Sequence, residues 1–303
     1  MFVINYRKIF LSISAILVAL SVFAIFFFGL NFGIDFKGGS ITEVSYPTER
    51  PTLNQVEESI NSLGLSESLI QPIGEDGFLV RTQSLKEEER LGLISALSLG
   101  KTVELKEERF NSIGPVVGEE MKSKAWTAIF TVIFAIILFI AFVFRHVSEP
   151  VSSWKYGLVA IVALIHDIII PTGIFAFLGS MFIEAQIDVL FVTALLAILG
   201  FSINDTIVVF DRIRENLRIN LQGHIREEFS KTVGKSLRQT FARSINTSMT
   251  TLFVLLALYF FGPETTKNFT LVLSIGLIAG TYSSIFLASP LLVVIERFSS
   301  KRN

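Results

Sequence analysis

Six long apolar stretches, separated by short polar segments and by one much longer polar segment, dominate the chain. A helix needs about 20 mostly apolar residues to cross the hydrocarbon core of a bilayer. The first stretch is too long for a signal peptide and has no clear small-residue cleavage site, so it is expected to be retained. The sequence therefore predicts six transmembrane helices, over the ranges Ile9–Leu30, Ala125–Phe144, Tyr156–Leu178, Ile187–Phe210, Ile245–Phe261 and Thr270–Ile295.

The long polar segment, residues 31–124, has the patterns of a folded domain. Alternating apolar residues predict strands at 40–46, 68–73, 77–83 and 102–110, and helical spacing predicts helices at 52–64 and 84–100. Ser84 is the expected N-cap of the second helix, and Gly64 and Gly100 follow the two helix ends. The order β-α-β-β-α-β is typical of a ferredoxin-like domain. Gly38 and Gly39 are better explained by a tight turn than by a ligand site.

Basic residues gather in alternate connections, which indicates the orientation of the chain. With six spans, all of these connections lie on one side, so both termini are expected to be cytoplasmic and the polar domain external. The predicted organisation is a first span in residues 1–30, the external domain in 31–124, and five spans in 125–303 with a basic cytoplasmic loop around 212–244. The basic residues in question are Arg7, Lys8, Arg145, Lys155, eight between 212 and 246, Arg297, Lys301 and Arg302.

Composition excludes several classes of function. The chain has 303 residues, of which 51% are hydrophobic, and a net charge of −1, so no nucleic-acid partner is indicated. It contains no Cys, and its three His are far apart, so neither a metal site nor a cofactor is expected. No phosphate-binding loop of the G-x-x-x-x-G-K-[ST] type occurs, and no nucleophile–base arrangement is evident. An ATP-driven machine and an enzyme are therefore both disfavoured.

Ionisable residues inside the predicted spans are the candidate functional groups. Asp205, next to Asn204, lies in the fourth span, and a charged Asp at mid-bilayer costs about 2.5–3.5 kcal/mol on insertion scales. His166 and Asp167 lie together near the middle of the third span. Burial favours the protonated carboxyl group and a nearby cation favours the ionised one, so an intramembrane Asp near an Arg can load and release a proton. The alternatives are an end-of-helix position for Asp205 and a simple helix–helix hydrogen bond for His166.

Two further patterns fall in the last two spans. Arg243, Thr247 and Thr250 have the spacing of one helix face, and this stripe can point into a helix bundle toward Asp205. The alternative is that Arg243 extends to the cytoplasmic interface. Gly276 and Gly280 form a G-x-x-x-G pair, which indicates close helix packing within the chain or against a partner.

Five ordered motifs closely resemble those of the SecF family. They are "NFGIDFKGGS" after the first span, "NSIGPVVGEEM" before the second, "HD" in the third, "GFSINDTIVVFDRIREN" at the fourth and "SLRQTFARSINTS" entering the fifth. SecF is the smaller subunit of the bacterial SecD–SecF accessory of the Sec translocase and belongs to the resistance-nodulation-division superfamily. The resemblance covers nearly the whole chain, with the same six-span layout.

This resemblance implies a proton-coupled subunit of protein export in the bacterial inner membrane. The expected partners are SecD, the SecYEG translocon, YajC/YidC-type accessory proteins and unfolded preproteins. The Asp of the "ND" pair and the Arg of the "Q-T-x-x-R" stretch are the family's functional membrane residues, and they correspond to Asp205 and Arg243. His166, Asp167, Asn204 and Thr247 are expected to belong to a polar pathway.

Two other functions remain open from the residues alone. A small-molecule exporter half of the same superfamily usually has a second external domain within one longer chain. A scaffold that only stabilises the translocase would not depend on Asp205.

Overall fold

The computed structural model describes residues 2–65, 68–143, 153–182 and 184–300. The chain forms two compact units, one made of Met1–Asn31 with Thr127–Asn303 and the other of Phe32–Trp126. Arg145, Lys301 and Arg302, which contribute to the charge pattern, lie outside the described residues. The same holds for Phe144, where the second span was expected to end.

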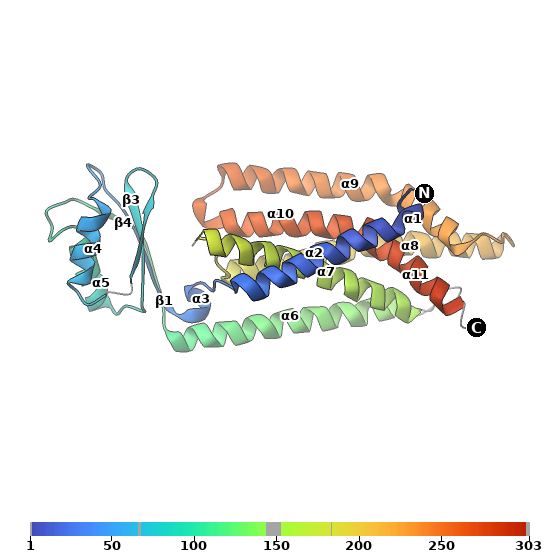
Figure 1. The fold of residues 1–303 in the computed structure, drawn as a ribbon, viewed down its shortest axis with the longest axis horizontal. Coiled ribbons are helices and arrows are strands. Elements are labelled where there is room, and N and C mark those ends of the chain that lie inside the picture. Colours follow the sequence, from blue (N-terminus) through green and yellow to red (C-terminus); the bar gives the residue numbers. More distant parts are fainter. Residues whose placement is uncertain (1, 66–67, 144–152, 183, 301–303) are drawn as a thin grey trace. The chain divides into compact units, whose positions relative to one another are not determined.

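Within the described residues, six helices are long and apolar enough to cross a membrane. This number confirms the six predicted spans. The helices lie in the first unit, except that α6 begins in the second unit, at Pro115. Helices α7, α8 and α10 with α11 form the buried centre, while α2, α6 and α9 are largely exposed. Figure 1 shows these helices running along one common direction. The helices are α2 (Arg7–Phe28), α6 (Pro115–Val143), α7 (Ser153–Met181), α8 (Val189–Gln222), α9 (Phe229–Phe261), α10 (Lys267–Tyr282) and α11 (Ser289–Ser300), with short α1 (Phe2–Asn5) before them and η1 (Glu264–Thr266) before α10.

The basic segment around 212–244, which the sequence predicts as a loop between two spans, is mostly helical in the structure. Helix α8 continues to Gln222 and α9 begins at Phe229, which leaves a short connection. Polar side chains hold the two extensions together: Asn216 Nδ2 donates to Ser236 Oγ and to Gln239 Oε1, both at 2.8 Å. These polar pairs lie beside buried apolar residues of the same two extensions, among them Ile213, Val233 and Leu237, so the contact between α8 and α9 is mixed in character.

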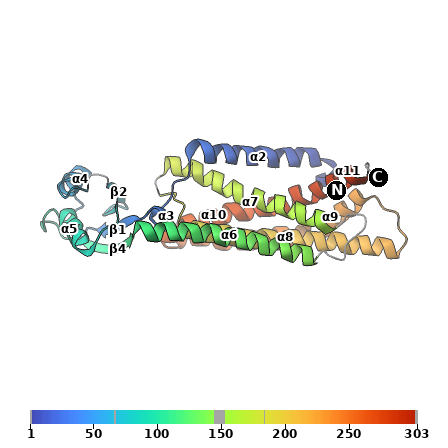
Figure 2. The same cartoon turned by 90° about the horizontal axis from the view of Figure 1, so that it is seen from below.

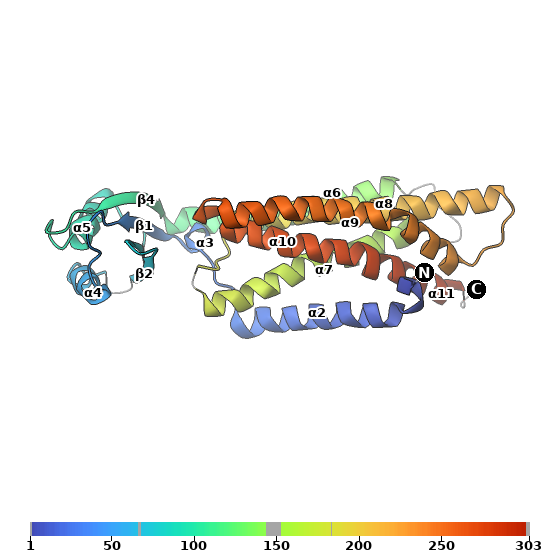
Figure 3. The ribbon, with the colours of Figure 1, turned by 90° about the horizontal axis from the view of Figure 1, so that it is seen from above.

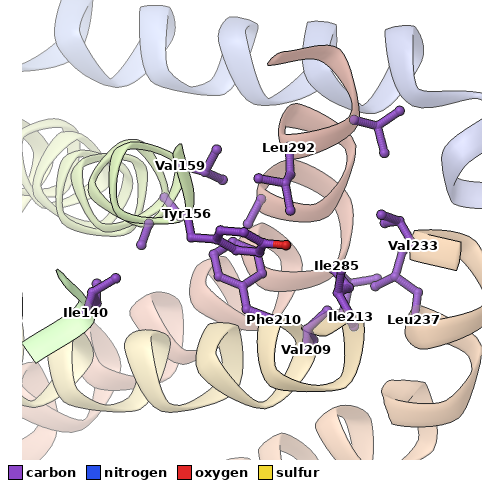
Figure 4. Packing of buried hydrophobic residues seen from close by; sticks show 14 of the residues in the cluster. Ile140, Tyr156, Val159, Val209, Phe210, Ile213, Val233, Leu237, Ile285 and Leu292 are labelled. Carbon is purple, nitrogen blue, oxygen red and sulfur yellow. The ribbon is translucent and has the colours of Figure 1, made fainter. Parts of the chain in front are cut away.

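An apolar cluster closes the end of the first unit where α1 and α11 lie. Figure 4 shows Tyr156 and Phe210 in its middle, and their ring centroids are 5.3 Å apart. Val159 of α7, Ile213 of α8 and Leu292 of α11 pack around them. The cluster therefore joins the two central helices to the C-terminal helix.

Helix α2 lies along α7, as Figures 2 and 3 both show. The contact is close because Gly173 of α7 has no side chain: a Cβ there would lie 2.4 Å from Ser21 Cβ. Small residues allow membrane helices to approach in this way.

The second unit has the predicted element order β-α-β-β-α-β, preceded by the short helix α3 (Ile34–Lys37). Its four strands form an antiparallel sheet in the order β2-β3-β1-β4. The elements are β1 (Gly39–Ser45), α4 (Leu53–Asn61), β2 (Leu69–Ile73), β3 (Gly77–Thr82), α5 (Glu87–Leu97) and β4 (Lys106–Ile113). The last strand begins later than the sequence predicted, because alternation of apolar residues alone does not fix where pairing with β1 starts.

Helices α4 and α5 cover an apolar core that includes Val44, Ile60 and Phe78. Tyr46 is buried among these residues, and its hydroxyl group donates a hydrogen bond of 3.0 Å to the carbonyl oxygen of Leu97, the last residue of α5. Burial also raises the pKa of Tyr46 to about 12, so this side chain stays neutral and keeps its donor.

Two details of this unit differ from the sequence-based expectations. The N-cap of α5 is Lys86 rather than Ser84, and the backbone N–H of Lys86 donates to Glu89 Oε2 at 2.7 Å. Ser84 lies instead beside Ser112, with 3.4 Å between their hydroxyl oxygens. Gly38 has a φ of 77°, and a Cβ there would lie 2.9 Å from Pro115 Cα. This glycine is therefore required by a close backbone approach as well as by a turn.

Candidate functional site: two carboxylates among serine hydroxyls

Asp167 of α7 is completely buried and is hydrogen-bonded to three side chains. Ser283 Oγ donates to its Oδ2 at 2.7 Å, and Ser202 Oγ makes a short hydrogen bond to the same oxygen. His166 Nδ1 lies 2.8 Å from Asp167 Oδ1, although the two residues are neighbours in sequence. Three partners compensate for the removal of this carboxylate from water.

His166 is also buried, with 2% of its surface exposed, and its ring stacks on Tyr282 at a centroid distance of 6.1 Å. Its Nε2 atom is buried and has no hydrogen-bond partner within the described residues. The Tyr282 hydroxyl group donates to the carbonyl oxygen of Phe10 at 3.1 Å. The pair His166–Asp167 therefore has one ring nitrogen engaged and the other available for a proton or a water molecule.

Asp205 of α8 is half-buried and accepts hydrogen bonds from two other helical segments. Ser244 of α9 donates to its Oδ1 at 2.6 Å, and Ser284 donates to its Oδ2 at 2.5 Å. A cavity of about 20 Å³ lies beside it, between Ser202, Ser248 and Gly280. That volume suffices for about one water molecule. Asp205 is thus placed where a proton could reach it through water and hydroxyl groups.

Ser283 and Ser284 belong to η2 (Ser283–Ala288), a π-helical segment that joins α10 to α11. Pro290 follows shortly after, and a proline both lacks an N–H and clashes with the carbonyl group four residues earlier. A wider π turn relieves this conflict, and such turns occur often at functional sites. Ser289 Oγ donates to the carbonyl oxygen of Ser284 at 3.3 Å, which supports the widened turn.

In this structure, Arg243, Thr247 and Thr250 do not point toward Asp205. All three side chains are exposed, and the hydrogen bond to Asp205 from α9 comes from Ser244. The inward face of α9 is offset from the predicted stripe by one residue, which corresponds to a rotation of about 100°. Spacing defines a stripe on a helix but does not determine which stripe faces inward. Asn204, the neighbour of Asp205, is exposed as well.

The G-x-x-x-G pair packs within this chain, against α8. A Cβ at Gly276 would lie 2.1 Å from Ile198 Cδ1, and one at Gly280 would lie 3.2 Å from Ser202 Cβ. These glycines therefore bring η2 and its two serines close to the carboxylates.

Sequence reasoning missed the four serines that bind the carboxylates: Ser202, Ser244, Ser283 and Ser284. The signal that could have found the last two is the Ser-Ser pair followed by Pro290 within an apolar span. Metal binding is a separate question: within the described ranges, no group of three or more His, Asp or Glu could hold a metal ion.

The fold and the site define a multi-pass membrane protein with ionisable residues held between its central helices. Residues 95–297 match the family described as "Protein export membrane protein SecD/SecF, C-terminal", and residues 23–46 match the "SecD/SecF GG Motif". The chain is 42% identical to the protein translocase subunit SecF of Thermobaculum terrenum, with 96% of this chain and 92% of the relative aligned. It is 35% identical to that of Pseudomonas aeruginosa, over 95% of this chain and 89% of the relative.

Solved structures agree with these relatives. The crystal structure of SecDF from Thermus thermophilus, described as a translocon-associated membrane protein, has a TM-score of 0.81 at 30% identity and covers 99% of this chain. A SecDF structure in a super-membrane-facing form has a TM-score of 0.69. This chain spans only 38% and 39% of those two longer chains. The chain belongs to the SecD/SecF family and is a SecF-type subunit of the Sec protein translocase.

Proposed function

We propose that this chain works with a SecD-type partner and uses the proton-motive force to promote preprotein translocation and release across the cytoplasmic membrane. The observation that carries the proposal is Asp205, a carboxylate on a membrane helix whose partners are two serine hydroxyl groups. Ionisable residues inside a membrane are costly and usually serve a function. A hydroxyl group can pair with either form of a carboxyl group, since it both donates and accepts. Asp205 is therefore suited to bind and release a proton.

Arg243 is the second proposed member of the relay, although it does not contact Asp205 in this state of the chain. It precedes Ser244, so a rotation of α9 by about 100° would exchange the two side chains at the carboxylate. His166 and Asp167 are proposed as inner parts of the polar pathway, and Asn204 and Thr247 as parts exposed toward a partner.

The partners we propose are SecD, the SecYEG channel, YajC/YidC-type accessory proteins and unfolded preproteins. The SecDF structures support a SecD-type partner, because this chain corresponds to only part of each of them. The relatives are named as translocase subunits, which favours a role without ATP hydrolysis.

We further propose that both termini are cytoplasmic and that residues 31–124 form a ferredoxin-like domain outside the membrane. Helices α1 and α11 lie at the same end of the first unit (Figures 1 to 3), which supports termini on one side. Basic residues Arg7, Lys8 and Arg297 occur there, as the positive-inside rule expects for a cytoplasmic side. The antiparallel β2-β3-β1-β4 sheet supports the ferredoxin-like assignment.

Preprotein translocation into membrane vesicles tests the proposal. Asp205→Asn keeps the size of the side chain and cannot ionise, so it should abolish the part of translocation that an uncoupler removes from wild type. Asp211→Asn is the matched control, since Asp211 lies on the same helix but is exposed. With ATP and SecA held constant, undiminished uncoupler sensitivity in Asp205→Asn vesicles would favour the scaffold alternative.

A further inference from the structure

Ser283 and Ser284 are adjacent residues, and each donates a hydrogen bond to a different carboxylate. Ser283 Oγ lies 2.7 Å from Asp167 Oδ2, and Ser284 Oγ lies 2.5 Å from Asp205 Oδ2. Successive residues of a helix point about 100° apart. One turn of η2 therefore donates hydrogen bonds to carboxylates of α7 and α8 at the same time.

Each of these serines also has a second acceptor within reach. Ser283 Oγ lies 3.1 Å from the carbonyl oxygen of Gly280, and Ser284 Oγ lies 3.1 Å from that of Thr281. A serine hydroxyl group carries one hydrogen, so it donates to only one acceptor at a time. The carboxylate and the backbone carbonyl thus compete for the same hydrogen.

We propose that Ser283 and Ser284 are hydroxyl switches that keep Asp167 and Asp205 hydrogen-bonded in both of their protonation states. The proposal deepens the proton-carrying role of Asp205 and rests on it. Both serines are positioning residues, since they act on the proton through the carboxyl groups that carry it.

Apart from the added proton on the carboxyl group, the two states differ only in the direction in which the serine O–H bond points. When the carboxyl group is ionised, the serine O–H donates to it. When a proton arrives, it forms an O–H bond on the carboxyl oxygen, and this group donates to the serine oxygen. The serine O–H then turns to the carbonyl oxygen of Gly280 or Thr281, and release of the proton reverses each step. No heavy atom has to move, and every polar group keeps a partner in both states. An unpaired buried polar group would disfavour the state in which it occurred.

The ionisable groups around the switches are few among the described residues. Asp167 is in contact with His166 of its own helix, and Tyr282 of α10 stacks on that His166 ring. On α9, the residue that faces Asp205 is Ser244, while its neighbour Arg243 is exposed. Local pairing of the carboxyl groups is therefore made mainly by hydroxyl groups.

Infrared difference spectroscopy tests the proposal on the full chain with its partner in lipid. The C=O stretching bands of the protonated carboxyl groups are followed against pH and assigned by their loss in Asp167→Asn and Asp205→Asn. Ser284→Ala should shift the frequency of the Asp205 band and let the band persist to higher pH. The proton affinity of Asp205 should rise about tenfold or more, because the ionised form loses a hydrogen-bond donor. Ser283→Ala should act in the same way on the Asp167 band, and Ser284→Cys, a weaker donor of similar size, should give an intermediate result.

Ser274→Ala is the control, since Ser274 is buried in α10 and, among the described residues, donates only to the backbone carbonyl of Thr270, at 2.7 Å. It should leave both bands unchanged. The switch is wrong if the carboxyl bands keep their position and pH dependence in the Ser283 and Ser284 variants. It is also wrong if Asp167 shows no protonated band at any pH. If these results occur while Asp205→Asn still abolishes proton-dependent export, only the switch fails. If Asp205→Asn leaves that export intact, the proposed function fails.

Discussion

Gly173→Ala tests how closely α2 must approach α7. A Cβ at this position would lie 2.4 Å from Ser21 Cβ and 2.5 Å from Ser21 Cα, whereas ordinary contacts begin near 3.4 Å. The obstacle includes backbone, so no side chain can rotate away, and the helices would have to separate by about 1 Å. Overpacking of this kind costs about 1–3 kcal/mol, and the backbone contact places this substitution at the upper end.

The matched control is Gly200→Ala, because Gly200 lies in helix α8 and an added Cβ there meets nothing within 4 Å. Replacing a helical glycine with alanine at an open position stabilises by up to about 1 kcal/mol. The same gain offsets part of the cost at Gly173, so the two variants should differ by about 3 kcal/mol in stability. Thermal unfolding of the purified chain in detergent, followed by circular dichroism, shows which of the two variants is more stable. Gly173→Ala should unfold at the lower temperature. Equal unfolding temperatures for the two variants would refute the close α2–α7 contact.

Three further predictions concern other parts of the chain. Tyr46→Phe leaves the last carbonyl group of α5 without its buried donor and should destabilise the second unit by about 1–3 kcal/mol, seen as faster hydrogen exchange of its core amides. Asp188→Ala removes the N-cap of α8, where Asp188 Oδ1 accepts from the N–H of Phe191 at 2.7 Å, and should cost about 1 kcal/mol of thermal stability; an unchanged unfolding temperature would contradict the cap. A reporter that is active only outside the cytoplasm should work when inserted at Gly74 and fail at Gly223, and the reverse pattern would contradict the proposed orientation.

The sequence was sufficient to predict the elements whose signal is local. Six apolar stretches gave six membrane helices, and alternating and helical spacings gave the β-α-β-β-α-β order of the second unit. Helix ends were less predictable where polar residues make the packing contact. Asn216 of α8 is hydrogen-bonded to Ser236 of α9. Both helices therefore continue into a segment whose polar composition, taken alone, is typical of a loop.

The candidate site was predictable only in part, because its geometry depends on helix rotation. Asp205, Asp167 and His166 could be identified, since ionisable residues in apolar spans are conspicuous. The sequence could not show which face of α9 contacts Asp205, because Arg243 and Ser244 both belong to polar stripes with helical spacing. The serines of η2 were missed for a similar reason: hydroxyl groups are common in membrane helices, and only a neighbouring carboxylate distinguishes them.

The central claim is that Asp205 carries a proton. The most direct test is to measure proton movement across the membrane. Vesicles containing this chain with its SecD-type partner are given an imposed pH gradient, and a pH-sensitive dye inside them follows its decay while a preprotein is translocated. We expect wild type and Asp211→Asn to dissipate the gradient at the same rate, and Asp205→Asn to dissipate it no faster than vesicles without the complex. Equal decay in Asp205→Asn and wild-type vesicles would contradict the claim.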